Sequence, residues 1–141
     1  MASILGHARR HARPLAAVVL LGSMSAVWSA DLTLSGANEV PPVSTTAAGS
    51  GSISVTDDGS VSGSVKTTGI TGTMAHIHVG AAGKNGPVIV PLTQGANGEW
   101  AVPAGAKLSP EHMKSYKAGE LYVNVHSEAH KGGEIRAQLA P

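Results

Sequence analysis

Residues 52–65 read SISVTDDGSVSGSV, and this stretch carries the plainest structural signal in the chain. Apolar and small polar residues alternate on both sides of Asp58-Gly59, which is the period-two pattern of a half-buried β-strand. Glycine tolerates the positive φ that a tight hairpin turn requires. The stretch therefore predicts a β-hairpin, and Asn97-Gly98 predicts a second tight turn of the same kind.

The same alternation continues outward from this hairpin over the chain after Asp31. It predicts seven or eight short antiparallel strands, at residues 32–35, 51–56, 60–67, 74–79, 88–92, 99–102, 121–127 and 134–139. One short crossover helix is expected, with Ser109 as its N-cap, Pro110 at its first position and Gly119 at its end.

The composition narrows the fold class to all-β. Only Trp100, Tyr116 and Tyr122 supply aromatic bulk after residue 30, so valine, isoleucine, leucine and alanine must fill the core. Two thin sheets packed about 10 Å apart suit such side chains. We therefore predict an antiparallel β-sandwich, and a closed barrel of similar size fits the same pattern.

Residues 1–30 have the composition of a secretory signal peptide. Three arginines precede an apolar run at 15–22, and mostly small residues follow it. The apolar run is shorter than the ~20 residues of a membrane-spanning helix. We expect export to the periplasm or full secretion, cleavage between residues 26 and 30, and a mature domain at 31–141 with no membrane span after cleavage. An uncleaved anchor is the alternative, because about seventeen uncharged residues, 14–30, precede Asp31.

The charge and cysteine counts exclude several classes of protein. Residues 31–141 contain seven Lys and Arg against nine Asp and Glu, with no basic run, so the basic surface of a nucleic-acid-binding protein is missing. Without cysteine there is no disulfide, no Cys-ligated zinc and no thiol nucleophile. No GxSxG elbow or phosphate-binding glycine loop is present. A metal must be held by histidine, carboxylate or methionine.

Two of the seven histidines project from one face of a predicted strand. In Ala75-His76-Ile77-His78-Val79 the apolar residues alternate and take the core, so both imidazoles lie on the opposite face. Their Cα atoms are then about 6.5 to 7 Å apart. This spacing allows both imidazoles to reach one metal ion at ~2.0 to 2.1 Å.

By the same parity, His126 lies with Asn124 on the polar face of the 121–127 strand. A third imidazole from a neighbouring strand would complete a three-nitrogen site with an open fourth position. We therefore predict a mononuclear metal site of His76, His78 and His126. Copper is the expected metal because copper(II) stands highest in the affinity order, while zinc also accepts imidazole. Met74 shares the face and its thioether suits copper(I), but we do not count it as a ligand.

The remaining polar residues of interest have simpler interpretations. His112 and His130 lie at the predicted helix start and in a turn, where we expect solvated side chains. Arg136 falls on the polar face of the last strand. An ordinary cross-strand ion pair with Glu134 or Glu120 is expected for it.

Five motifs then carry a family resemblance: LSGANEVPP at 34–42, AHIHVG at 75–80, NGPV at 85–88, GELYVNVHS at 119–127 and GGEIRAQL at 132–139. In this order they resemble the CHRD domain, the module named after chordin that also occurs as stand-alone exported bacterial proteins. The resemblance spans nearly all of 31–141. It implies a Greek-key, immunoglobulin-like β-sandwich.

A weaker local similarity points to copper/zinc superoxide dismutase, in the HxH strand and the Gly-Gly-x-x-Arg element. It implies His76 and His78 as copper ligands and His126 as a third. The chain lacks that enzyme's disulfide cysteines and its histidine-rich zinc loop, so no bridging histidine or binuclear site is assigned.

Three functions follow from these observations. The leading hypothesis is an exported copper-binding domain for copper handling or redox chemistry. The alternative is a metal-free extracellular interaction or matrix module that uses sheet edges and the segment Glu39-Val40-Pro41-Pro42. The third is a copper-dependent, superoxide dismutase-like enzyme. The sequence assigns no catalytic residue and identifies no protein partner.

Overall fold

The computed structural model describes residues 22–141, so the predicted leader before residue 22 lies outside the described residues. The described chain is all-β with one short helix. Its strands are β1 (Val27–Ser35), β2 (Ala48–Thr56), β3 (Val61–Thr68), β4 (Gly72–Val79), β5 (Val88–Pro91), β6 (Thr93–Gln94), β7 (Glu99–Ala101), β8 (Leu121–Ser127) and β9 (Ile135–Leu139). A 3-10 turn, η1 (Gly36–Asn38), follows β1, and α1 (Pro110–Lys117) precedes β8.

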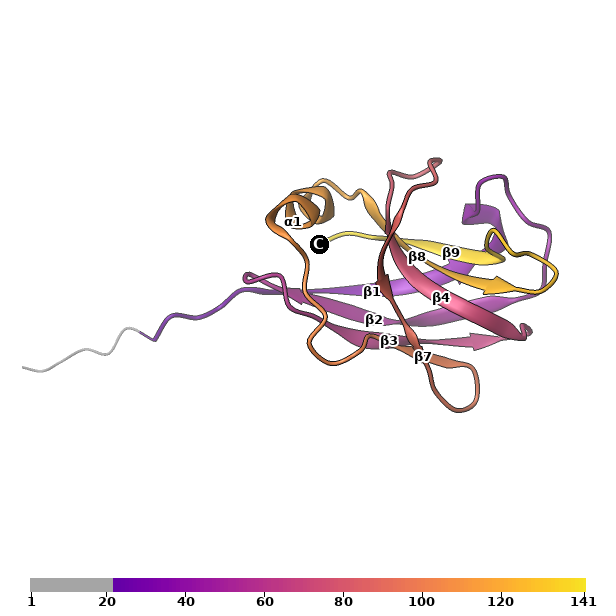
Figure 1. Cartoon of the computed structure of the whole chain (residues 1–141), viewed down its shortest axis with the longest axis horizontal. Helices are drawn as coiled ribbons and strands as arrows, with labels where there is room; N and C mark the ends of the chain where they lie inside the picture. Colours follow the sequence, from indigo (N-terminus) through magenta and orange to yellow (C-terminus); the bar gives the residue numbers. More distant parts are fainter. Residues whose placement is uncertain (1–21) are drawn as a thin grey trace, which may run out of the picture.

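The strands follow one another in the order β5-β4-β8-β9-β1-β2-β3-β7-β6, and the neighbouring pairs are antiparallel. One layer contains β4, β8 and β9, and the other contains β1, β2 and β3 (Figure 1). A single pair, Ser35 with Arg136, joins β1 to β9 and makes the two layers one continuous sheet. The predicted antiparallel all-β sandwich is therefore confirmed, with partial closure toward a barrel.

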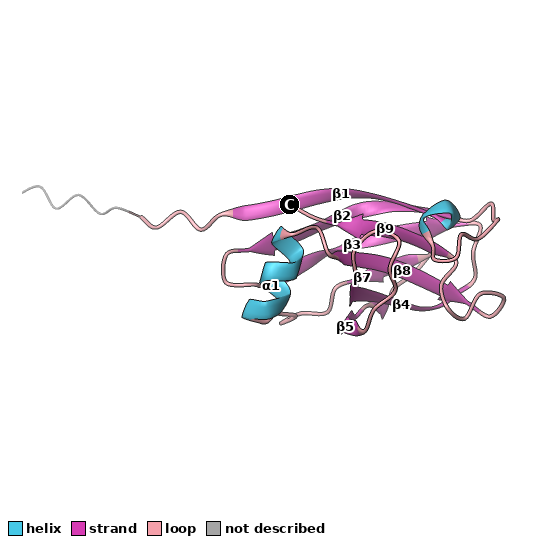
Figure 2. Ribbon diagram, turned by 90° about the horizontal axis from the view of Figure 1, so that it is seen from above, coloured by secondary structure: helices cyan, strands magenta, loops and turns pink. Residues whose placement is uncertain are grey.

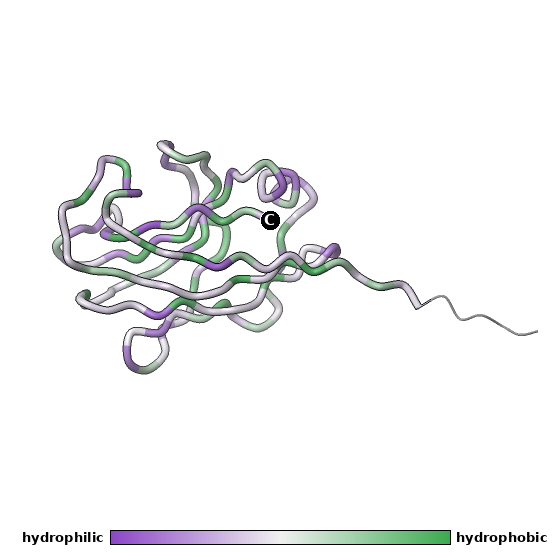
Figure 3. The backbone as a smooth tube through the Cα atoms, turned by 180° about the vertical axis from the view of Figure 1, so that it is seen from behind, coloured by the Kyte–Doolittle hydropathy of each residue, from purple (hydrophilic) through white to green (hydrophobic). Residues whose placement is uncertain are grey.

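The core lies between the layers and consists mainly of aliphatic side chains. Members that are at most 1% exposed include Leu34, Ile53, Val55, Val65, Ile77, Leu121, Val123, Val125, Ile135 and Leu139. Figure 3 shows that the most hydrophilic stretches include loop tips and the helix, while much of each strand is neutral or hydrophobic. The alternation in the sequence thus predicts the core face correctly.

The helix has the predicted ends. The Ser109 side chain accepts a hydrogen bond of 3.1 Å from the His112 backbone N–H, Pro110 occupies the first position, and Gly119 follows with a positive φ of 75°. Figure 2 shows α1 and η1 at opposite ends of the strands. Among the described residues, none of the helices has the length and apolar character needed to cross a membrane.

Strand β1 starts inside the segment assigned to the leader. Val27 pairs with Thr56 of β2, and Ala30 pairs with Ile53. Cleavage after Ala30 would remove four residues of this strand, whereas cleavage after Ala26 would keep all of it. The domain boundary at residue 31 stays a prediction.

Candidate metal centre

The register of β4 against β8 brings the three predicted histidines together. Met74 pairs with His126, and His76 pairs with Asn124. The ring centroids of His76 and His126 are 4.9 Å apart, and those of His76 and His78 are 5.4 Å apart. One nitrogen from each of the three rings lies within 4.8 Å of the other two. These nitrogens are close enough to surround a single ion.

Backbone carbonyls orient two of the three rings. His78 Nδ1 lies 2.9 Å from the Gly86 carbonyl oxygen, and His126 Nδ1 lies 2.9 Å from the Lys131 carbonyl oxygen. A carbonyl only accepts, so each Nδ1 carries the hydrogen, and in the neutral form of each ring Nε2 keeps its lone pair. Ligating histidines in metalloproteins are oriented in this way by an outer hydrogen bond.

The ring nitrogens that face one another in the cluster have few hydrogen-bond partners within the protein. His78 Nε2 is buried without a hydrogen bond among the described residues. His126 Nε2 lies 3.1 Å from His76 Nδ1. A bound cation would satisfy the first nitrogen and replace the contact between the other two.

The protonation states also suit a metal. Burial lowers the pKa of His76 below its usual value, and the neighbouring rings of His126 and His78 lower it further. Burial is also the main cause that lowers the pKa of His78. Both imidazoles are therefore neutral at neutral pH, which is the form that binds metals.

The polar face of the sheet is covered by loops. Strand β8 is buried along its whole length, on the face that carries His126 as well as on the core face. The loop at 80–87 bonds to the loop at 36–47 through the Asn85 side chain and the Val40 carbonyl oxygen, 2.7 Å apart. A third loop, 128–134, supplies the carbonyl of Lys131.

The three histidines differ in their exposure to solvent. Only 7% of His78 and of His126 is exposed, while His76 is half-buried. The cluster therefore opens to solvent on the His76 side.

Arg136 does not form the expected ion pair, and that prediction is wrong. Its guanidinium lies 3.5 Å from the centroid of the Tyr122 ring, and the residue is 1% exposed. It donates hydrogen bonds to the Ala81 carbonyl oxygen, Gln138 Oε1 and Asn85 Oδ1. Glu134 instead accepts from the Ser127 hydroxyl. The covering loop, and not a neighbouring strand, supplies most partners of Arg136.

Glu39 is a functional candidate that the sequence does not single out, because the sequence predicts only an interaction segment at Glu39-Val40-Pro41-Pro42. It is 4% exposed, and Oε1 has no hydrogen-bond partner among the described residues. A Cβ at Gly133, whose φ is 124°, would lie 2.5 Å from both Glu39 Oε1 and Asn124 Nδ2. Glycine is therefore required beside this carboxyl. Burial raises the pKa of Glu39 to about 7, against the opposing effects of Arg136 and Asn124.

Glu39 is expected to make the fold less stable as the pH rises. Its pKa is about 7 in the folded state against a usual 4.5, so the proton favours the folded state. This stabilisation is complete below about pH 4.5 and is lost as the pH rises through 7. The free energy of unfolding should therefore fall by roughly 2 to 3 kcal/mol between pH 4.5 and 8.5 because of Glu39, and Glu39→Gln should remove this fall. Urea unfolding of both proteins across this range measures it.

The control for that experiment is Glu99→Gln, because Glu99 is an exposed carboxylate on β7. It should keep the pH dependence of the unchanged protein. If Glu39→Gln also keeps that dependence, the assignment of the effect to Glu39 is wrong.

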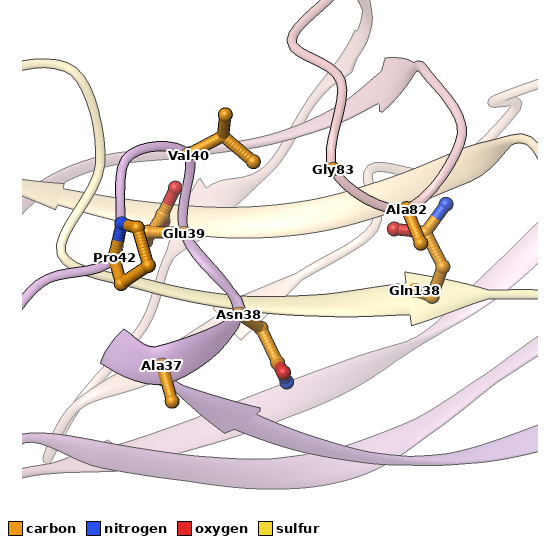
Figure 4. Close-up of a pocket in the computed structure, with 8 residues that line it drawn as sticks. All are labelled: Ala37, Asn38, Glu39, Val40, Pro42, Ala82, Gly83 and Gln138. Atoms are coloured by element: carbon orange, nitrogen blue, oxygen red, sulfur yellow. The ribbon is translucent and has the colours of Figure 1, made fainter.

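A pocket of about 420 Å³ lies beside Glu39 (Figure 4). Val40 and Pro42 line it on one side and Ala82 on the other. Gln138 also lines it, but its amide already donates to the carbonyl oxygens of Gly80 and Gly119. None of the three clustered histidines lines this pocket, so it is separate from the candidate metal centre.

The fold and the site together define a β-sandwich module with a three-histidine cluster under covering loops. The chain belongs to the CHRD domain family, whose model matches residues 31–139. This match confirms the resemblance carried by the five sequence motifs and supports an extracellular module. No curated protein and no solved structure matches the chain.

Proposed function

We propose that this chain is an exported CHRD-domain protein that binds one copper ion through His76, His78 and His126, for copper handling or redox chemistry outside the cytoplasm. The observation that carries the proposal is the convergence of three imidazole nitrogens within 4.8 Å. Copper is preferred because copper(II) has the highest affinity among the divalent metals that imidazole binds.

An exposed strand face can also carry histidines that serve only solubility, but this explanation fits the site poorly. Residues that serve solubility remain exposed, whereas His78 and His126 are buried. A buried nitrogen without a partner costs about 1 to 3 kcal/mol, and His78 Nε2 is such an atom. Metal binding would offset that cost.

Copper(II) is expected to bind in a one-to-one ratio and to raise the melting temperature. A ligand present at 100 times its Kd stabilises the folded state by about 2.7 kcal/mol, which corresponds to roughly 10 °C for a domain of this size. Calorimetric titration and thermal melts in a buffer without chelators measure both quantities. Electron paramagnetic resonance should show nitrogen hyperfine structure.

The same titration with zinc decides between the two metals. Tighter binding of zinc than of copper would change the assigned metal but keep the three ligands. An unchanged melting temperature with excess of either metal would count against the site itself.

A metal-free interaction module is the second candidate function. The observation in its favour is that Glu39, Val40 and Pro42 line two surface pockets, of about 420 and 570 Å³. This function predicts that substitution of all three clustered histidines leaves partner capture intact.

A further inference from the structure

Methionine 74 lies directly beside the histidine cluster. It is the Cα partner of His126 across the β4–β8 ladder, and it precedes His76 by two residues on the same strand. Residues two apart on a strand share a face, and direct antiparallel partners do as well. Met74 therefore lies on the ligand face, as the cross-strand partner of one proposed ligand and two residues from another.

The local backbone places Met74 at the open side of the cluster. The β4–β8 register shifts between Gly72 and Met74, and the Thr73 hydroxyl donates a hydrogen bond of 3.3 Å to the His126 carbonyl oxygen. Met74 is 49% exposed, although most large apolar side chains of the described chain are buried. His76, the half-buried histidine, lies on the same side.

The three histidine ligands leave a fourth coordination position of the ion open for Met74. Among the described residues, the group of His, Cys, Asp and Glu side chains that could hold an ion comprises the three histidines alone. A thioether is a soft donor that selects copper(I), whereas imidazole serves both oxidation states. The methionine side chain is unbranched and flexible, so it adjusts to an adjacent ion at small cost.

We propose that Met74 is a fourth ligand of this site when the bound copper is copper(I). The inference rests on the proposed three-histidine copper site and adds to it a ligand that is specific for copper(I). The three imidazoles bind copper(II), and the thioether joins them for copper(I). The site then retains the metal in both states.

The test compares the full chain with its Met74→Leu variant, because leucine keeps the volume and removes the sulfur. Copper(I) affinity is measured without oxygen by competition with bicinchoninate, and copper(II) affinity by competition with nitrilotriacetate. Met74→Leu should weaken copper(I) binding by about tenfold or more and change copper(II) binding by less than about threefold. A tenfold selective loss lowers the copper reduction potential by about 59 mV.

Val88→Ala is the matched control, since Val88 is also an exposed apolar residue and is the Cα partner of His78. It should leave both affinities unchanged. Equal loss of both affinities in Met74→Leu, or no loss of either, would overturn the role of Met74. A parent chain that binds copper in neither state would instead overturn the three-histidine site, and this inference with it.

Discussion

Replacement of His126 by alanine is expected to abolish copper binding, and His76→Ala is expected to abolish the same binding event. Both rings contribute a nitrogen to one cluster and lie in direct contact, 3.1 Å apart between nitrogens. Loss of a direct ligand should exceed the 10- to 100-fold loss of affinity that outer-sphere substitutions typically cause. Calorimetric titration with copper(II) measures the affinity of each variant.

His112→Ala provides the matched control for these variants. It makes the same chemical change on helix α1, outside the cluster. Its copper affinity should equal that of the unchanged protein, and circular dichroism should show that all variants are folded. If only one of His76 and His126 matters for binding, the two histidines do not share an ion and the proposed site is wrong.

The sequence predicts the faces of the strands correctly because a strand has a period of two. Ala75 and Ile77 are in the core, and His76 lies on the opposite face. Parity does not determine the register between β4 and β8. These two strands are far apart in the chain, because β5, β6, β7 and α1 lie between them. A slip of two residues would keep every side chain on its face and change the distance between His126 and His76, increasing it in one direction and decreasing it in the other. Only the structure therefore shows that the rings of His76 and His126 are close together.

The covering loops explain the other differences between prediction and structure. Loop segments have no periodicity, so their path over a sheet face is not encoded in an alternation of residues. The burial of Glu39 and the contacts of Arg136 both depend on that path. Strand β6 was not predicted for a simpler reason, because a strand of two residues is too short to show an alternating pattern.

Arg136→Met is expected to destabilise the fold by roughly 3 to 5 kcal/mol. Methionine would retain part of the contact with Tyr122 but would leave three acceptors of the guanidinium without a donor. These acceptors lie on half-buried or exposed residues, so each lost hydrogen bond costs about 0.5 to 1 kcal/mol, and the desolvated cation–π contact contributes about 2 kcal/mol more. Arg136→Lys should recover little, because an ammonium group reproduces neither the fork of donors nor the stacking.

Urea unfolding measures these losses, with Lys66→Met on β3 as the control for removal of a strand cation. Lys66 is exposed, so its substitution should change the free energy of unfolding by less than about 0.5 kcal/mol. If Arg136→Met costs less than about 1 kcal/mol, the covering loop does not depend on the guanidinium. A large loss would instead show that Arg136 fixes the loop at 80–87 over the sheet. That loop contains Gly86, whose carbonyl orients His78. The same substitution should then weaken copper binding without removing any ligand.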